Sequence, residues 1–85
     1  MLNSPFMLAQ AERLAKRLRT EVPSEGEASD RHRIDRAYRL LYGRSPAEAE
    51  VRLGLAFLRG GEDRPARWAL YAHVLLAANE MLFLD

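Results

Sequence analysis

The sequence contains no cysteine and only two histidines, His32 and His73. Without cysteine the chain forms no disulfide and holds no metal through thiolates. A zinc site would need three or four ligands at a recognisable spacing, and neither H-x-x-x-H nor H-E-x-x-H occurs. We therefore expect no metal and no cofactor in this chain.

An excess of charge of one sign is also missing. Thirteen basic residues face twelve acidic ones, which gives a formal net charge of +1. This balance provides no overall field that would attract nucleic acid or an anionic membrane. No stretch approaches the roughly 18 consecutive apolar residues of a membrane span, and the charged residues from Glu12 onward are not typical of a signal peptide. If the chain is complete as given, we expect it in the cytoplasm.

Catalytic motifs are absent from the sequence as well. There is no G-x-S-x-G elbow and no phosphate-binding loop. Ser4 and Ser45 are better explained as helix caps than as nucleophiles. Glu80 lies near the end of an apolar helix, where its carboxylate must accept a hydrogen bond or face solvent. We expect no catalytic residue, and hence no enzyme activity of this chain alone.

What the sequence does contain is helical periodicity. Apolar positions repeat at helical spacing between capping signals, and they predict four helices, near residues 5–20, 30–43, 46–59 and 65–82. The segment near 21–29 carries Pro, Gly and several Glu with little that is apolar, which predicts a mobile acidic linker. The length fits one domain, residues 1–85.

Local signals mark the ends of the second and third predicted helices. Asp30 is placed to cap the second helix, and Gly43 is a favourable residue to end it. Ser45 as N-cap, followed by Pro46 and by Glu48 three residues on, fits a capping box. Two helices joined by so short a turn are expected to pack as a hairpin or as a helix-turn-helix corner.

The third predicted helix carries two apolar rows. One row consists of Ala49, Leu53, Ala56 and Phe57, and the other of Val51, Leu55 and Leu58. A helix with a single apolar stripe buries it against one neighbour. We therefore expect this helix to contact two neighbours.

The last predicted helix is apolar around most of its circumference. Such a helix lies at the centre of a fold or forms part of an interface. We predict an all-α, compact antiparallel bundle of about four helices with a central apolar C-terminal helix. Because large apolar and aromatic side chains dominate interface energetics, we expect the anchors for a partner to be Trp68, Tyr71, Leu75, Met81 and Phe83.

A cluster of arginines offers an alternative function. Its members are Arg31, Arg33, Arg36, Arg39 and Arg44. Together with the turn at Gly43, this segment has the outline of a helix-turn-helix that binds nucleic acid through the third helix. However, that helix begins with two glutamates, which would repel phosphates. A helix-turn-helix-like nucleic-acid-binding module is therefore the second hypothesis.

Three segments of the sequence resemble one protein family. They are the opening MLNSPFMLAQAERLAKRL, the middle RIDRAYRLLYGRSPAEAE and the closing RWALYAHVLLAANEMLFLD. In this order they resemble the C-terminal end of the planctomycete PSD1 (DUF1553) proteins. The resemblance implies a long, exported protein with a DUF1549 region and often a cytochrome c-like region with haem; this chain itself has no C-x-x-C-H motif. The family's activity is unassigned, so the resemblance transfers no catalytic residue.

These observations together predict a structural or protein-interaction helical subdomain of a larger, exported, planctomycete-type protein. Its partner would be the remainder of that parent protein or a second copy in a homodimer. Met1 would then correspond to an internal position of the family rather than to a true start. We expect no contact with a membrane.

Overall fold

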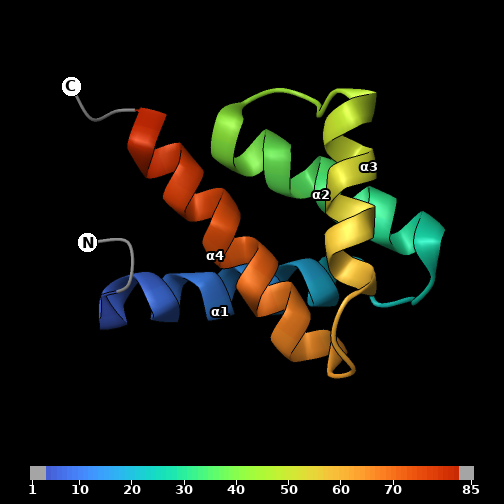
Figure 1. The fold of residues 1–85 in the computed structure, drawn as a ribbon, viewed down its shortest axis with the longest axis horizontal. Coiled ribbons are helices and arrows are strands. Elements are labelled where there is room, and N and C mark those ends of the chain that lie inside the picture. Colours follow the sequence, from blue (N-terminus) through green and yellow to red (C-terminus); the bar gives the residue numbers. More distant parts are fainter. Residues whose placement is uncertain (1–3, 83–85) are drawn as a thin grey trace.

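Four helices account for the fold. The computed structural model describes residues 4–82, with side chains as far as residue 79. The helices are α1 (Pro5–Glu21), α2 (Glu27–Tyr42), α3 (Glu48–Arg59) and α4 (Arg64–Leu82) (Figure 1). Residues 4–82 contain no strand, and the prediction of an all-α bundle is confirmed.

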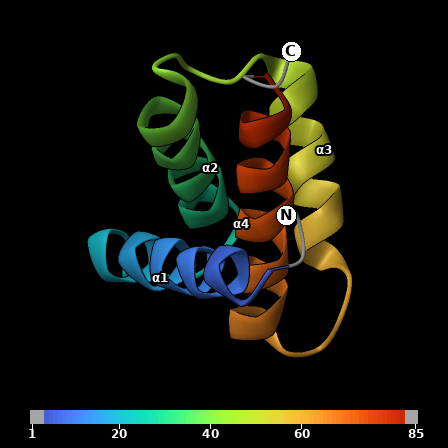
Figure 2. The ribbon, with the colours of Figure 1, turned by 90° about the vertical axis from the view of Figure 1, so that its left-hand side faces the viewer.

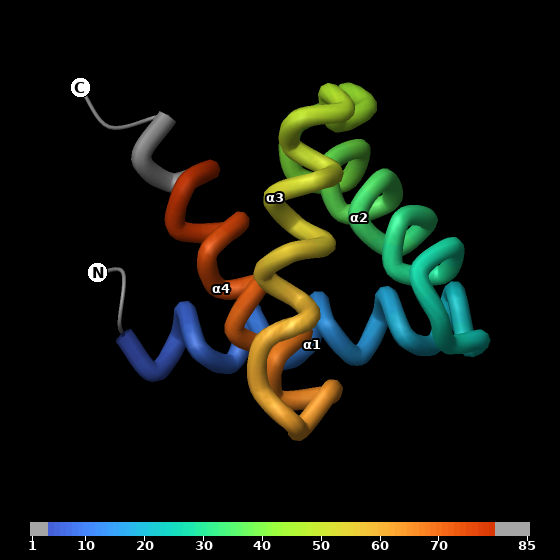
Figure 3. Tube along the Cα trace, turned by 45° about the vertical axis from the view of Figure 1, so that its right-hand side comes forward, coloured from blue at the N-terminus to red at the C-terminus, as the bar shows by residue number. Residues whose placement is uncertain are grey.

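The C-terminal helix is central, as predicted. α4 contacts each of the other three helices. Figure 2 shows α2, α3 and α4 standing side by side, with α1 running below α2 and in front of the lower part of α4 at a steep angle. In Figure 3, α1 passes behind α3, and the backbones of these two helices are not neighbours. α1 therefore covers one side of α4, and α3 packs against a different side of α4.

Small side chains allow α1 and α4 to pack closely. This pair forms the most extensive contact between helices. Ala11 and Ala15 of α1 and Ala72 of α4 are almost completely buried. The distance between packed helices depends on the size of the side chains at the contact, so these alanines bring the two backbones together.

Two of the predicted helix ends are found where the sequence places them. The hydroxyl of Ser4 accepts a hydrogen bond from the Met7 amide at 3.1 Å and caps α1. Gly43 ends α2 with a φ of +69°, a left-handed conformation that glycine adopts without steric cost.

The second helix begins earlier than predicted. Its first residue is Glu27, capped by Gly26, and Asp30 lies one turn inside the helix instead of capping it. The linker predicted over residues 21–29 is therefore reduced to Val22–Gly26. This short connection is tied down, because the buried Arg33 guanidinium donates hydrogen bonds to the carbonyl oxygens of Val22 and Ser24 at 2.7–3.0 Å.

The third helix begins later than predicted. Ala47 is its N-cap, and the carboxylate of Glu50 accepts a hydrogen bond from the Ala47 amide at 2.8 Å. The predicted capping box on Ser45 is not formed, since the Ser45 hydroxyl accepts a hydrogen bond from Arg39 instead. Glu50 rather than Glu48 accepts the hydrogen bond at this cap, because its ion pair with Arg44 fixes the Glu50 side chain beside the Ala47 amide.

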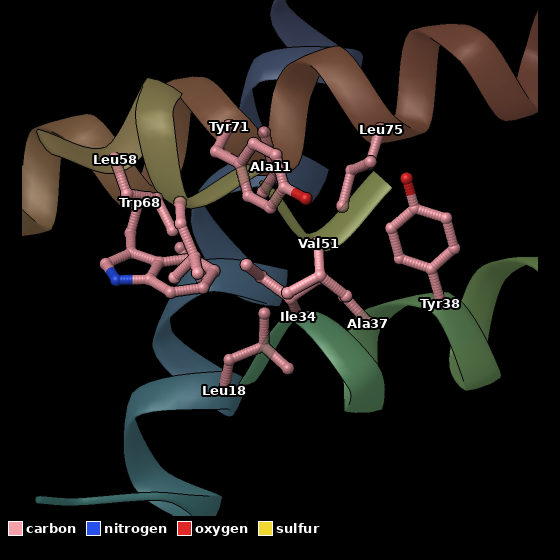
Figure 4. Close-up of a cluster of buried hydrophobic side chains, with 13 residues drawn as sticks. Ala11, Leu18, Ile34, Ala37, Tyr38, Val51, Leu58, Trp68, Tyr71 and Leu75 are labelled. Carbon is pink, nitrogen blue, oxygen red and sulfur yellow. The ribbon is translucent and has the colours of Figure 1, made fainter. Parts of the chain in front are cut away.

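The core is one cluster to which all four helices contribute (Figure 4). Its largest fully buried apolar side chains are Leu18, Ile34, Leu58 and Trp68. The Arg33 guanidinium lies over the Trp68 ring, 5.6 Å from its centroid. The same guanidinium thus contacts both the core, at Trp68, and the connection between α1 and α2, at Val22 and Ser24.

Candidate interaction surface

An open groove lies between α2, α3 and α4. It has a volume of about 730 Å³. Most of the side chains that line it are apolar or aromatic: Tyr38, Leu41, Tyr42, Leu53, Phe57, Tyr71, Val74, Leu75 and Ala78. Binding sites in proteins are typically concave and apolar, with a few polar groups. This groove is the site that fits that description best among the described residues.

All three tyrosines of the chain line this groove. Tyr38 and Tyr42 come from α2, with their ring centroids 5.0 Å apart in an edge-to-face arrangement. The Tyr42 hydroxyl donates a hydrogen bond of 2.7 Å to the carbonyl oxygen of Leu75 on α4. Figure 4 shows the Tyr38 ring reaching up from α2 and the Tyr71 ring reaching down from α4. The tyrosines therefore form the floor that joins the two helices.

Tyr71 is the most buried of these tyrosines, with 5% of its surface exposed. Its hydroxyl makes no hydrogen bond of regular geometry among the described residues, although the Tyr38 hydroxyl is close enough to interact with it. Burial raises the pKa of Tyr71 far above its ordinary value, so the hydroxyl is neutral. Gly54 on α3 leaves the space for it, because a β-carbon at that position would lie 2.6 Å from the hydroxyl oxygen.

An ion pair forms part of the groove lining. Two nitrogens of Arg44 donate to the two carboxylate oxygens of Glu50, each at 2.9 Å. The Arg44 guanidinium also lies over the Tyr38 and Tyr42 rings. Hydrogen bonds from Arg44 and from the Ala47 amide lower the pKa of Glu50 to about 2. The groove therefore carries no unpaired charge of its own.

Exposed apolar side chains stand around the groove. Leu53 on α3 is 72% exposed, and Leu70 and Val74 on α4 are 46% and 48% exposed. Leu70 and Val74 are four residues apart and lie on one side of α4. We call the groove together with Leu53, Leu70 and Val74 the α3–α4 face.

The two apolar rows of α3 differ in how far they are buried. Val51, Leu55 and Leu58 are buried against the rest of the chain. In the other row Ala49, Leu53 and Ala56 are exposed. The sequence predicts two neighbours for this helix, and α3 does contact two, α2 and α4. Phe57 of the second row is half-buried against Tyr71, so only part of that row faces outward.

The predicted anchors are mostly used inside the chain itself. Trp68, Tyr71 and Leu75 are 1%, 5% and 5% exposed and belong to the core. Tyr71 and Leu75 also form part of the groove wall, whereas Trp68 is an internal contact and offers no surface to a partner. Met81 and Phe83 lie outside the residues whose side chains are described.

Sequence reasoning missed the apolar side chains that are exposed on this surface. Leu70 and Val74 sit within the long apolar arc of the last helix, where periodicity does not separate core positions from surface positions. The signal for Leu53 was present in the second apolar row of α3. Phe57 of that row packs against Tyr71 of α4, but the periodicity did not show that Leu53 would stay exposed.

The predicted basic patch is neutralised within the chain. Each arginine has a carboxylate partner: Arg31 with Glu48, Arg33 with Glu25, Arg36 with Glu21, Arg39 with Asp35, and Arg44 with Glu50. Arg33 is also 1% exposed and cannot reach a phosphate. The other four arginines stay at the surface, each beside a carboxylate whose charge offsets its attraction to phosphate.

Other chemistry is sparse in the described part of the chain. Among residues 4–79, whose side chains are described, no group of three His, Asp or Glu side chains is placed to hold a metal ion. His32 is exposed on α2, His73 is partly buried on α4, and the side chain of Glu80 lies outside the description. None of the helices between residues 4 and 82 has the length and apolar character needed to cross a membrane.

Comparison with known proteins gives one match. A family model described as PSD1, protein of unknown function (DUF1553), matches residues 1–58. The matched residues include α1, α2 and nearly all of α3, and α4 lies beyond them. No curated protein and no solved structure matches the chain.

Proposed function

Because this chain belongs to the PSD1 family of proteins of unknown function (DUF1553), we propose that it is a helical interaction subdomain whose α3–α4 face binds another polypeptide. The observation that carries the proposal is the position of Leu53, which is 72% exposed beside an apolar groove. Single exposed apolar residues are common on protein surfaces. Large contiguous apolar patches are rare on monomers and often mark interaction sites.

The composition of the face supports a protein partner. Interface centres are depleted in charged residues and enriched in aromatic ones. The groove contains three tyrosines and Phe57, and its single ion pair is satisfied internally. A partner that covers it would bury apolar surface without stranding a charge.

The proposal assigns binding, and no reaction, to these residues. In it the chain acts as one part of a larger, exported protein, the setting that the family resemblance implies. The nucleic-acid alternative is not carried further, because the arginines on which it depends are paired with carboxylates.

A fluorescent apolar dye tests whether the face is open for binding. We expect the folded chain to enhance the fluorescence of anilinonaphthalene sulfonate, and we expect Leu53→Glu and Val74→Glu to abolish most of that enhancement. Leu8→Glu is the matched control, because Leu8 is 48% exposed, as Val74 is, but lies on α1, away from α3. Equal fluorescence in all four proteins would contradict the proposal.

A further inference from the structure

We propose that a second surface, where α1 packs against α2 and α4, binds an acidic polypeptide segment that carries an apolar side chain at its centre. This surface differs from the α3–α4 face, and among the described residues only Leu41 lines both grooves. The inference therefore goes beyond the proposed function. The lining, the charge and the size of the second groove carry it.

The second groove is lined by apolar side chains and by arginines. Arg13 and Arg17 of α1 line it and are exposed. Three helices, α1, α2 and α4, contribute half-buried leucines to it: Leu14, Leu40, Leu41 and Leu76. No carboxylate is among the described residues that line it. We call the hollow between these side chains the α1 groove.

Positive charge is in surplus beside these leucines. The Glu21 carboxylate accepts hydrogen bonds from both Arg17 and Arg36, each at 2.8 Å, so two positive charges share one negative charge. Arg13 has no ion pair with any described residue. Arg13 and Arg17 are also four residues apart, a spacing at which like charges on a helix repel each other. A carboxylate of a partner would pair with Arg13 and relieve that repulsion.

The surplus is a local property of this surface. The whole chain has a formal net charge of only +1. At the α3–α4 face, Arg44 and Glu50 pair with each other at 2.9 Å and leave no charge for a partner. An acidic partner is therefore attracted to the α1 groove rather than to the chain as a whole, and complementary charge of this kind directs which surface is bound.

The size of the groove favours a side chain of a polypeptide over a free small molecule. Its volume is about 290 Å³, at the lower limit of the roughly 300–1,000 Å³ of ligand pockets. A polypeptide needs to place only one apolar side chain among the leucines, while its neighbouring carboxylates stay outside beside the arginines. A few such anchors supply most of the binding energy of protein interfaces.

The lining also distinguishes an acidic polypeptide from a nucleic acid. Proteins that bind single strands stack the bases on aromatic side chains. The described lining of the α1 groove has leucines and no aromatic ring. An acidic segment with an apolar side chain is the occupant that both the charge and the lining fit.

Fluorescence anisotropy of a labelled peptide tests this assignment. The probe is a rhodamine-labelled peptide with two leucines flanked on each side by three glutamates. We expect it to bind the chain at low ionic strength and to be released as salt screens the charges. A peptide of equal charge with serines in place of the leucines should bind about tenfold more weakly, because it buries no apolar side chain.

Two charge reversals locate the binding site. Arg13→Glu should weaken binding of the leucine peptide about fivefold or more, because it replaces an attraction by a repulsion. Arg52→Glu is the matched control and should leave binding unchanged. Arg52 is likewise exposed and without an ion pair among the described residues, but it lies on α3, whose backbone does not neighbour α1. Circular dichroism verifies that both variants are folded.

Four results would overturn the proposal. The first is no binding of the leucine peptide at millimolar concentration, and the second is a serine peptide that binds as tightly. The third is an equal loss in Arg13→Glu and Arg52→Glu, which would show that overall charge alone attracts the peptide. The fourth is tighter binding of a single-stranded oligonucleotide or of an anionic lipid vesicle that is lost in Arg13→Glu, because the surface would then bind phosphate.

Discussion

At the scale of single residues, a buried polar group without a regular hydrogen bond is costly, and Tyr71 carries one. Its hydroxyl lies in the wall of the groove and makes no hydrogen bond of regular geometry among the described residues. Leaving a buried hydroxyl unpaired costs about 1–3 kcal/mol. Tyr42, on the same groove, has a comparable hydroxyl that is satisfied by the Leu75 carbonyl.

The two tyrosines therefore predict opposite effects of the same substitution. Tyr71→Phe should raise the free energy of unfolding by up to about 1 kcal/mol, because it removes a buried hydroxyl without a regular hydrogen bond. Tyr42→Phe should lower it by about 1 kcal/mol, because it leaves the Leu75 carbonyl without its donor. Urea denaturation followed by circular dichroism measures both. A Tyr71→Phe variant as unstable as Tyr42→Phe would contradict this assignment.

Arg33 is the second residue whose role depends on burial. It is 1% exposed and makes three hydrogen bonds to the carbonyl oxygens of Val22 and Ser24. The planar guanidinium serves several acceptors at once, whereas the ammonium of lysine is a compact charge with another geometry. Arg33 therefore holds the connection between α1 and α2 in place.

Replacing Arg33 by lysine should be far more damaging than the same change on the surface. We expect Arg33→Lys to lower the free energy of unfolding by about 1.5–3 kcal/mol, the range for hydrogen bonds to charged groups. The control is Arg36→Lys, at an exposed pair with Glu21, which should cost less than about 1 kcal/mol. Equal losses in urea denaturation would show that burial of Arg33 is not the reason for its contribution.

At the scale of elements, the turn between α2 and α3 depends on an ion pair that responds to pH. Arg44 and the Ala47 amide hold the pKa of Glu50 at about 2, below its ordinary value of 4.5. A carboxyl group with a lowered pKa in the folded state stabilises that state above pH 4.5. The contribution is lost as pH falls from 4.5 through about 2.

Stability should accordingly fall less steeply with acid in Glu50→Gln than in the unmodified chain. The measurement is the urea midpoint at a series of pH values from 5 down to about 2. Arg44→Gln should show a similarly shallow dependence, because it removes the largest cause of the lowered pKa. Glu21, whose pKa is lowered by Arg17 and Arg36, supplies part of the remaining slope. An unchanged slope in Glu50→Gln would refute the role of this pair.

The helices themselves could be predicted from periodicity, but two of their starts could not. Capping preferences favoured Asp30 and Ser45, which are good caps in isolation. Asp30 is instead buried and accepts hydrogen bonds of 2.6 and 2.7 Å from Arg64 on α4. Ser45 accepts a hydrogen bond from Arg39. At Asp30 the deciding contact comes from a distant helix, and at Ser45 it comes from the end of the preceding helix. Capping preferences take account of neither contact.

At the scale of the whole molecule, the apolar surplus of the sequence is divided between a core and an outer face. The sequence predicted that α4 would be central and that α3 would carry a second apolar row. It could not show which side chains remain exposed, because Leu75 and Val74 are adjacent in one apolar run, yet Leu75 is 5% exposed and Val74 is 48% exposed. That difference depends on how α1 and α2 cover α4, which is a property of the assembled fold.

The openness of the α3–α4 face to binding is measured most directly by the fluorescence of an apolar dye with the unmodified chain, Leu53→Glu and the control Leu8→Glu. We predict strong enhancement with the unmodified chain and with Leu8→Glu, and the loss of most of it with Leu53→Glu, because Leu53 is 72% exposed beside the groove. Equal enhancement with all three proteins would contradict the assignment of this face.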